Sequence, residues 1–307
     1  MKSELLRFLK STIVVLLGLL IIDLLTGFIG NKIIERLPNY GGATIKDNFR
    51  LNKLKTDILI IGSSRASHHY IPSYIKDNIK EKYSIYNAGH DGQFVDCNSC
   101  ITECVIKRKK PELIIFEIGE HELLSNDLKY RLETFSPYYN KNSIVKTYLD
   151  GLGMKERIKI KANLYKYNSK IPNFILSLTS NIGINDGYEP LYTKMKILKN
   201  KNTINDKNGN TKIEEYSKNN FTNVIKLCNK EHIKLIVVTS PRYKTDEKND
   251  FLKELCNTYN VPYIDMETTN YFNNHPELFA DAAHLNNDGA TIYTKMFIQR
   301  LKHYLKE

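Results

Sequence analysis

Five short apolar runs follow one another along the larger, C-terminal part of the chain. They are residues 57–61 (DILII), 83–87 (YSIYN), 112–118 (ELIIFEI), 233–239 (IKLIVVT) and 261–265 (VPYID). Between and after most of them, helical spacing of apolar positions covers about 70–81, 92–108, 213–231, 244–258 and 287–305. Short apolar strands that alternate with helices are typical of a parallel sheet covered on both faces. The pattern predicts an α/β domain over residues 56–307.

A longer apolar segment lies near the N-terminus. Residues 12–30 (TIVVLLGLLIIDLLTGFIG) contain a single charge, Asp23, and as a helix they match the ~30 Å hydrocarbon core of a bilayer. A cleavable signal peptide has an apolar region of only ~7–15 residues before an A-x-A-like site, which this chain lacks. We therefore predict a basic tail (1–11), a transmembrane anchor (12–30) and a linker (31–55). Asp23 is costly at bilayer depth and calls for a polar partner, a helix-pairing role or access to water.

Basic residues flank the anchor on both sides, so their count does not set its orientation. They are Lys2, Arg7 and Lys10 before it and Lys32, Arg36, Lys46 and Arg50 after it. A short basic tail, one apolar segment and a large domain usually place the domain across the membrane from the tail. We therefore expect a single-pass protein whose domain lies outside the cytoplasm, in the periplasm or at the cell surface.

The positive charge of the chain is concentrated in one segment. The 307 residues carry 45 Lys and Arg against 34 Asp and Glu, and residues 126–212 hold 16 of these basic residues, 7 of the acidic ones and 8 of the 20 tyrosines. This segment interrupts the strand–helix alternation, and Gly151 and Gly153 break its helical stretches, so we expect a partly helical cap inserted in the domain. Such a surface suits nucleic acid, anionic glycan or lipid headgroups, and outside the cytoplasm nucleic acid is not expected.

Three of the five cysteines share a helical spacing. Cys97, Cys100 and Cys104 would lie on one face of a helix. A metal cluster would need a further Cys or His at ligand spacing, and the sequence offers none. Small buried residues on a core-facing helix are the favoured interpretation, and no metal is expected.

Residues suited to nucleophilic catalysis occur at both ends of the α/β pattern. Ser63 and Ser64 end the first predicted strand, and ligands of parallel sheets bind at the carboxyl ends of strands. Asp281 and His284 stand three residues apart, just before the last predicted helix. A reactive serine needs a base, a carboxylate that orients this base, and donors for the oxyanion. In a loop, this spacing lets the carboxylate reach the ring nitrogen that faces away from the serine.

Four sequence blocks extend this interpretation. They are GSSRA (62–66), NAGHDGQ (87–93), IFEIGEHEL (115–123) and DAAHLN (281–286). In their order and places they resemble the blocks of the SGNH or GDSL hydrolase superfamily. The resemblance implies a flavodoxin-like three-layer αβα sandwich with a five-stranded, mainly parallel sheet. It also implies cleavage or transfer of ester-linked acyl groups without a metal or organic cofactor.

The resemblance also implies a role for individual residues. Ser64 is similar in position to the nucleophile, His284 to the general base and Asp281 to the orienting carboxylate. The backbone N–H groups of Ser64 and Gly92 would face the oxyanion, since Gly92 lies five residues after Asn87 as the glycine of this block usually does.

Two positions depart from the family pattern. Ser63 replaces the acidic residue of the usual GDS, which resembles membrane-associated members that act in cell-envelope acylation. His121 stands where the third block normally offers an asparagine. A neutral imidazole N–H could replace that oxyanion donor, whereas Glu120 and Glu122 beside it could raise its pKa. Losing one oxyanion donor costs ~10²–10³ in rate.

Other polar residues near these blocks have two interpretations each. Arg65 and Arg242 are candidates for binding an anionic substrate, and the alternatives are a local salt bridge for Arg65 and a solvated loop charge for Arg242. His68 and His69 are expected as surface residues at a helix entry, with an alternative base as the other possibility. Asp91 lies in the glycine loop near the expected pocket.

Three functions remain open from the sequence. The first is an anchored esterase or deacetylase that acts on acyl esters of envelope glycan or lipid. The second is an O-acyltransferase, in which a sugar hydroxyl replaces water and a membrane-bound partner supplies the acyl group. The third is a binding module that kept the fold without catalysis.

Overall fold

The computed structural model contains two compact units. It describes residues 2–37, 43–79, 82–124, 127–179, 186–196, 212–245, 248–267 and 270–305. Unit 1 comprises Met1–Phe49 and Glu133–Ile182, and unit 2 comprises Arg50–Leu132 and Gly183–Glu307. Helix α2 (Ala43–Asn52) and the 3₁₀ segment η2 (Asp127–Tyr138) each contribute residues to both.

Unit 2 contains a five-stranded parallel sheet in the order β2-β1-β3-β4-β5. The strands are β1 (Ile58–Ile61), β2 (Ile85–Asn87), β3 (Leu113–Glu117), β4 (Lys234–Thr239) and β5 (Tyr263–Asp265). Ile58 pairs with Ile85 on one side and with Leu113 on the other, so β1 lies where the strand order reverses. All five predicted strands are confirmed, and the sheet has the flavodoxin-like order that the resemblance implied.

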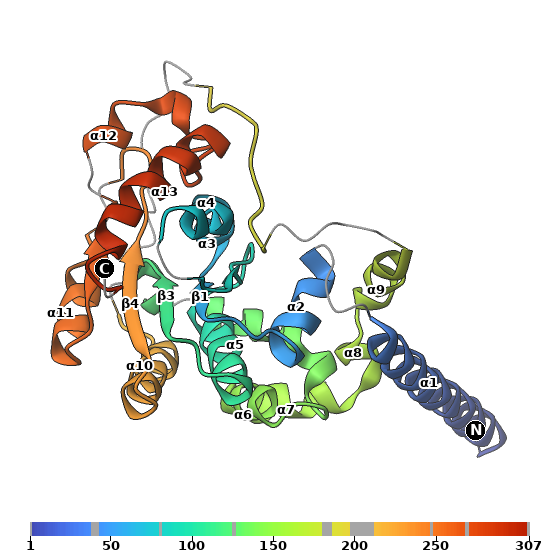
Figure 1. The fold of residues 1–307 in the computed structure, drawn as a ribbon. Coiled ribbons are helices and arrows are strands. Elements are labelled where there is room, and N and C mark those ends of the chain that lie inside the picture. The colour runs from blue at the N-terminus through green and yellow to red at the C-terminus, as the bar shows by residue number, and fades with distance from the viewer. Residues whose placement is uncertain are drawn as a thin grey trace. The chain divides into compact units, whose positions relative to one another are not determined.

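Helices cover both faces of this sheet (Figure 1). One face carries α3 (Ser64–His69), α4 (Pro72–Asp77) and α13 (Asn287–Leu301), and the other carries α5 (Val95–Arg108) and α10 (Glu215–Lys230). Shorter connections are η1 (Glu120–Leu123), α11 (Asp250–Thr258), α12 (Asn270–Asn273) and η3 (Pro276–Leu278).

The central positions of the strands are apolar because both faces of the sheet are buried. Ile58 and Ile60 pack with the α4 and α13 side, together with Tyr70 and Phe297. On the other face, the Phe116 ring meets the ring of Phe221 from α10, with centroids 5.2 Å apart. Alternate side chains of each strand therefore supply two separate apolar layers, which an alternating polar pattern could not do.

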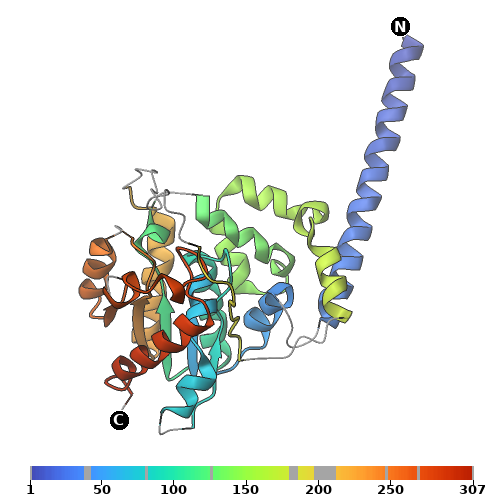
Figure 2. The ribbon, with the colours of Figure 1, turned by 90° about the horizontal axis from the view of Figure 1, so that it is seen from above.

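Unit 1 is helical. It contains α1 (Lys2–Arg36), α6 (Ser143–Gly151), α7 (Met154–Lys161), α8 (Asn163–Lys166) and α9 (Lys170–Thr179). Within the described residues, α1 is the one helix long and apolar enough to cross a membrane. Both views show α8 and α9 beside the C-terminal part of α1 (Figures 1 and 2).

The segment predicted as a partly helical cap, residues 126–212, contributes η2 and α6 to α9. Its residues 126, 180–185 and 197–211 lie outside the described part of the chain. Part of the predicted linker 31–55 is also helical, because α1 continues to Arg36 and α2 follows.

Candidate active site

Ser64 occupies the first turn after β1. Gly62 precedes it, and a Cβ on Gly62 would lie 2.6 Å from the Glu117 carbonyl oxygen. Gly89, after β2, approaches this turn as closely, because its Cβ would lie 2.4 Å from the Ser67 nitrogen. The glycines of the first two blocks thus let three strand ends pack together, and Ser64 begins α3 at this edge.

Asp281 and His284 lie in the loop before α13. Asp281 Oδ1 accepts hydrogen bonds from the backbone N–H groups of Ala283 and His284 at 2.8 and 2.9 Å, so the carboxylate stabilises the turn of its own loop. Its two oxygens both lie 2.9 Å from His284 Nδ1. Burial alone would raise the pKa of Asp281, but the hydrogen bonds from the His284 ring and from these two backbone groups lower it.

The His284 ring joins this carboxylate to Ser64. His284 Nε2 lies 2.7 Å from Ser64 Oγ. Since an ionised carboxylate can only accept, the proton of the neutral ring belongs on Nδ1, and Nε2 then accepts the serine hydroxyl proton. The structure brings together the three residues that the sequence nominated, in the hydrogen-bond order of a Ser-His-Asp triad.

The glycine loop after β2 is fixed by buried polar groups. The Asn87 side chain donates to the carbonyls of Ala66 and Tyr70 at 2.7 and 2.9 Å. Arg50, fully buried, donates to the Ala88 carbonyl and to the Gln93 side chain, both at 2.6 Å. This role of Arg50 could not be predicted from the sequence, because the residue falls in the predicted linker.

Gly92 belongs to this fixed loop. It adopts φ +68°, a left-handed conformation that favours glycine, and no atom lies within 4 Å of the position of a Cβ. The space beside Gly92, the proposed oxyanion donor, is therefore not filled by protein atoms. Its contribution to an oxyanion site stays a prediction.

His121 is the second residue of the short η1 turn after β3. A Cβ on Gly119 would lie 2.7 Å from His121 Nδ1 and 2.6 Å from Arg65 Nη2, so this glycine permits the two side chains to approach. Burial lowers the pKa of His121 to about 4; Glu122 acts in the opposite direction, and the charge of Arg65 adds to the lowering. The sequence suggested that neighbouring glutamates could raise this pKa, but burial has the larger effect and lowers it. His121 is therefore neutral near pH 7, and one of its ring nitrogens carries an N–H that can donate.

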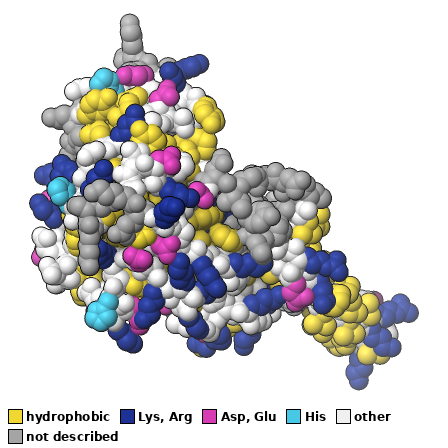
Figure 3. Space-filling view, in the orientation of Figure 1, with side chains coloured by type: hydrophobic (Ala, Val, Ile, Leu, Met, Phe, Trp, Pro, Cys, Tyr) yellow, Lys and Arg dark blue, Asp and Glu magenta, His cyan; other side chains and the backbone are white. Residues whose placement is uncertain are grey.

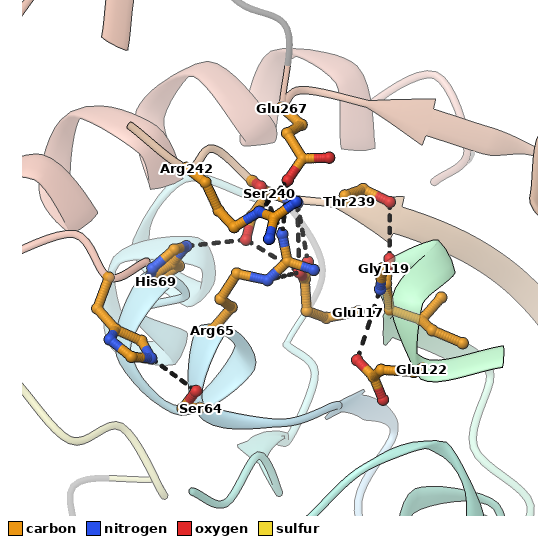
Figure 4. Close-up of polar contacts among 12 residues, drawn as sticks. Ser64, Arg65, His69, Glu117, Gly119, Glu122, Thr239, Ser240, Arg242 and Glu267 are labelled. Atoms are coloured by element: carbon orange, nitrogen blue, oxygen red, sulfur yellow. Dashed lines mark hydrogen bonds and ion pairs between the residues drawn. The ribbon is translucent and has the colours of Figure 1, made fainter. Parts of the chain in front are cut away.

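Arg65 is the centre of a buried ion-pair network at the carboxyl edge of the sheet (Figure 4). Its Nε lies 3.3 Å from Glu117 Oε1 and its Nη1 lies 3.2 Å from Glu267 Oε1. Burial alone would lower the pKa of Arg65, but these two carboxylates raise it. Arg242 donates from Nε to the same Glu267 oxygen. Both arginines nominated for substrate binding are thus engaged by protein carboxylates, and their contact with a substrate stays a prediction.

His69 ties this network to the triad loop. Its Nδ1 donates to Ser240 Oγ at 2.8 Å, and Ser240 Oγ donates to Glu117 at 3.0 Å. Its Nε2 accepts the backbone N–H of Leu285, the residue after His284, at 2.9 Å. Burial, reinforced by the positive charge of nearby groups, lowers the pKa of His69 well below its usual value, so the ring is neutral.

His68 lies beside the triad histidine. Its ring is 5.6 Å from the ring of His284, nearly perpendicular to it. Nδ1 lies 2.6 Å from the Glu189 carbonyl oxygen and Nε2 lies 3.0 Å from Asp91 Oδ1. Burial lowers the pKa of His68, but both acceptors outweigh it and raise the pKa. The prediction of two surface histidines is wrong: His68 is 5% exposed and His69 is fully buried.

The cysteines occupy the interior. All five are buried, and Cys97, Cys100 and Cys104 lie on α5, in agreement with the interpretation of small core-facing residues. Among the described residues, no group of three His, Cys, Asp or Glu side chains is arranged to hold a metal ion.

The comparisons with known proteins concern the fold. No family model and no curated protein matches the sequence. A solved protein from Desulfitobacterium hafniense, named as a lipolytic protein of the G-D-S-L family, is similar with a TM-score of 0.41 and 9% identity over 79% of this chain and 98% of its own. The lipase/acylhydrolase of Enterococcus faecalis is similar with a TM-score of 0.38 and 12% identity over 81% of this chain and 96% of its own.

Proposed function

We propose that this chain is a membrane-anchored serine ester hydrolase of the SGNH type. The observation that carries the proposal is the continuous hydrogen-bond chain from Ser64 Oγ through His284 to Asp281. A hydroxyl on a base that is itself oriented by a carboxylate is the arrangement that activates serine for attack on an acyl carbon.

In the proposed reaction, Ser64 Oγ forms a bond to the acyl carbon while its proton moves to His284 Nε2. Asp281 stabilises the resulting imidazolium. Backbone N–H groups at Ser64 and Gly92 and the neutral ring of His121 are the proposed donors to the oxyanion. The departing alcohol then takes the proton from His284. A water molecule attacks the acyl-enzyme in the same way, which releases the acid and restores the serine.

The proposed substrates are acyl esters of an envelope glycan or lipid. This assignment follows from α1, which is long and apolar enough to span a membrane, and from the position of the domain after it. We place the domain outside the cytoplasm, as the order of a short tail, one apolar segment and a large domain predicts. Protease added to intact cells, or to spheroplasts if there is an outer membrane, should then digest the domain, and protection until the inner membrane is broken would reverse this orientation.

The test uses the full chain in detergent with an activated acetyl ester. Ser64→Ala and His284→Ala should each lower turnover at least ~10⁴-fold, and the double variant should be scarcely worse, because the members of a triad act as a unit. Ser63→Ala is the matched control, since it removes the neighbouring hydroxyl and should leave turnover close to that of the wild type. A serine-directed phosphonate should label Ser64 alone. Unchanged activity in Ser64→Ala would refute the assignment.

Acyl transfer shares every step up to the acyl-enzyme. Acetate and acetylated product are therefore followed together, with and without a glycan acceptor. If acetylated product forms in place of acetate, the result would favour the acyltransferase. If the wild-type protein is inactive toward every ester and acceptor, the result would favour a binding module.

A further inference from the structure

Asp23, the one charge in the predicted anchor, has partners inside unit 1. Its Oδ1 accepts the backbone N–H of Leu164 at 2.8 Å, and its Oδ2 accepts the Asn163 side-chain amide at 3.0 Å. Two turns further along α1, the hydroxyl of Tyr167 donates to Asn31 Oδ1 at 2.9 Å. Helix α8 is thus attached to α1 by polar contacts from Asp23 onward.

Two glycines make this attachment close. A Cβ on Gly27 would lie 2.5 Å from the Asn163 side chain, and a Cβ on Gly30 would lie 2.5 Å from the Tyr167 ring. Gly27 and Gly30 are three apart, on the α1 face that α8 covers. The C-terminal third of α1 is therefore packed against protein on one side.

The part of α1 before Asp23 exposes apolar side chains instead. Its large apolar residues between Leu5 and Ile22 are all exposed, and Figure 3 shows them along α1 with basic side chains at its N-terminal end. About eighteen residues at ~1.5 Å each span ~27 Å, close to the ~30 Å of a hydrocarbon core. Arg7 and Lys10 lie near the far end of this stretch, where long basic side chains can extend to the headgroups.

The helices attached to α1 expose apolar side chains of their own. Among the described residues outside α1, nine large hydrophobic side chains are exposed, and six of them belong to α7, α8 and α9. These six form what we call the α7–α9 surface: Met154, Ile158, Leu164, Ile175, Leu176 and Leu178. Leu24, Leu25, Phe28 and Ile29 are also exposed, so the apolar surface of α1 continues past Asp23 alongside this one.

Basic residues accompany the apolar ones on α7. Lys155, Arg157 and Lys161 are exposed on the same short helix as Met154 and Ile158. Exposed cations beside apolar side chains can be attracted to the anionic headgroups of a bilayer surface.

We propose that the α7–α9 surface lies in the headgroup layer of the bilayer that α1 enters, with Asp23 at the boundary between hydrocarbon and headgroups. The inference rests on the membrane anchoring in the proposed function and specifies it. The bilayer-spanning part is then about Leu5–Ile22, shifted toward the N-terminus from the predicted 12–30. Asp23 and Asn163 satisfy each other where the polar interface begins, and the exposed cations of α7 meet anionic headgroups.

The chain contains no tryptophan, so single introduced tryptophans report on one place each. The full chain is reconstituted in phosphatidylcholine–phosphatidylglycerol vesicles that carry bromine either near the headgroups or near the bilayer centre. Ile158→Trp and Ile175→Trp should lose fluorescence mainly to the shallow bromines. Gly18→Trp, in α1, should lose it mainly to the deep ones, and Tyr192→Trp, an exposed position of unit 2, should lose it to neither.

The four probes separate the two possible failures. If Gly18→Trp is quenched while Ile158→Trp and Ile175→Trp behave like Tyr192→Trp, the anchor stands and the α7–α9 surface is not at the membrane. A partner protein or a second copy on this surface would give the same result and overturn the proposal. If Gly18→Trp is not quenched either, membrane anchoring itself fails, and the inference fails with it.

Discussion

Glu122 provides a quantitative test of the electrostatics beside the candidate active site. This carboxyl is buried in η1, and burial raises its pKa to about 7 from 4.5, with the charge of Arg65 acting in the other direction. The pKa of Glu122 in the folded protein lies above its value in the unfolded chain. The contribution of protonated Glu122 to the free energy of unfolding is therefore fully present below about pH 4.5 and is lost as the pH rises through about 7. A difference of roughly 2.5 pH units corresponds to about 3 kcal/mol, at ~1.4 kcal/mol per unit.

Glu122→Gln removes this titration while keeping the shape of the side chain. The assay is urea unfolding of the full chain in detergent, followed by circular dichroism at pH values across this window. The unfolding free energy of Glu122→Gln, measured relative to wild type, should rise by about 3 kcal/mol from the acidic to the neutral end. Glu215→Gln, at an exposed carboxylate on α10, should show no such change. A pH-independent difference between wild type and Glu122→Gln would refute the reasoning.

Three further predictions concern the groups around Ser64. His121→Asn should keep esterase turnover within about tenfold, whereas His121→Ala should lower it by ~10²–10³ if the ring is an oxyanion donor. Arg50→Met should cost about 1–3 kcal/mol in the unfolding free energy, because it leaves a buried carbonyl of the glycine loop without its donor. Gly89→Ala should destabilise by at least ~1–3 kcal/mol because its methyl group would meet the Ser67 nitrogen. Gly92→Ala, which has open space, should cost only about 1 kcal/mol for its backbone conformation, and thermal unfolding compares the two.

The sheet could be predicted because parallel strands buried on both faces have a simple sequence signature. β1 and β3 are apolar at nearly every position, so their places were visible without knowledge of their neighbours. The two helices after β1 are less clear from the sequence. The range predicted as one helix, 70–81, begins after α3 and includes α4, and the end of α3 at His69 has no signal in the apolar pattern.

The triad candidates were found because Asp281 and His284 are close in sequence and Ser64 follows a clear strand. The groups that hold them in place were missed, since Arg65 meets Glu267 across 202 residues and His69 meets Ser240 across 171. A buried charge or imidazole looks like a surface residue in the sequence until its partner is known. The sequence therefore indicated the candidate triad residues, and only the fold could identify the residues that hold them in place.

The contact of His69 with Leu285 has a consequence for how a substrate could be selected. The residue next to His284 is held to the sheet through two neutral side chains and a buried carboxylate, so the loop cannot swing outward without breaking internal hydrogen bonds. In the proposed reaction the base is therefore in position before any ester arrives, and binding energy need not be used to assemble it. Discrimination between acyl groups or acceptors would then depend on parts of the substrate site outside this loop. Exchanging those parts between related enzymes should change the preferred ester while leaving the chemical step intact.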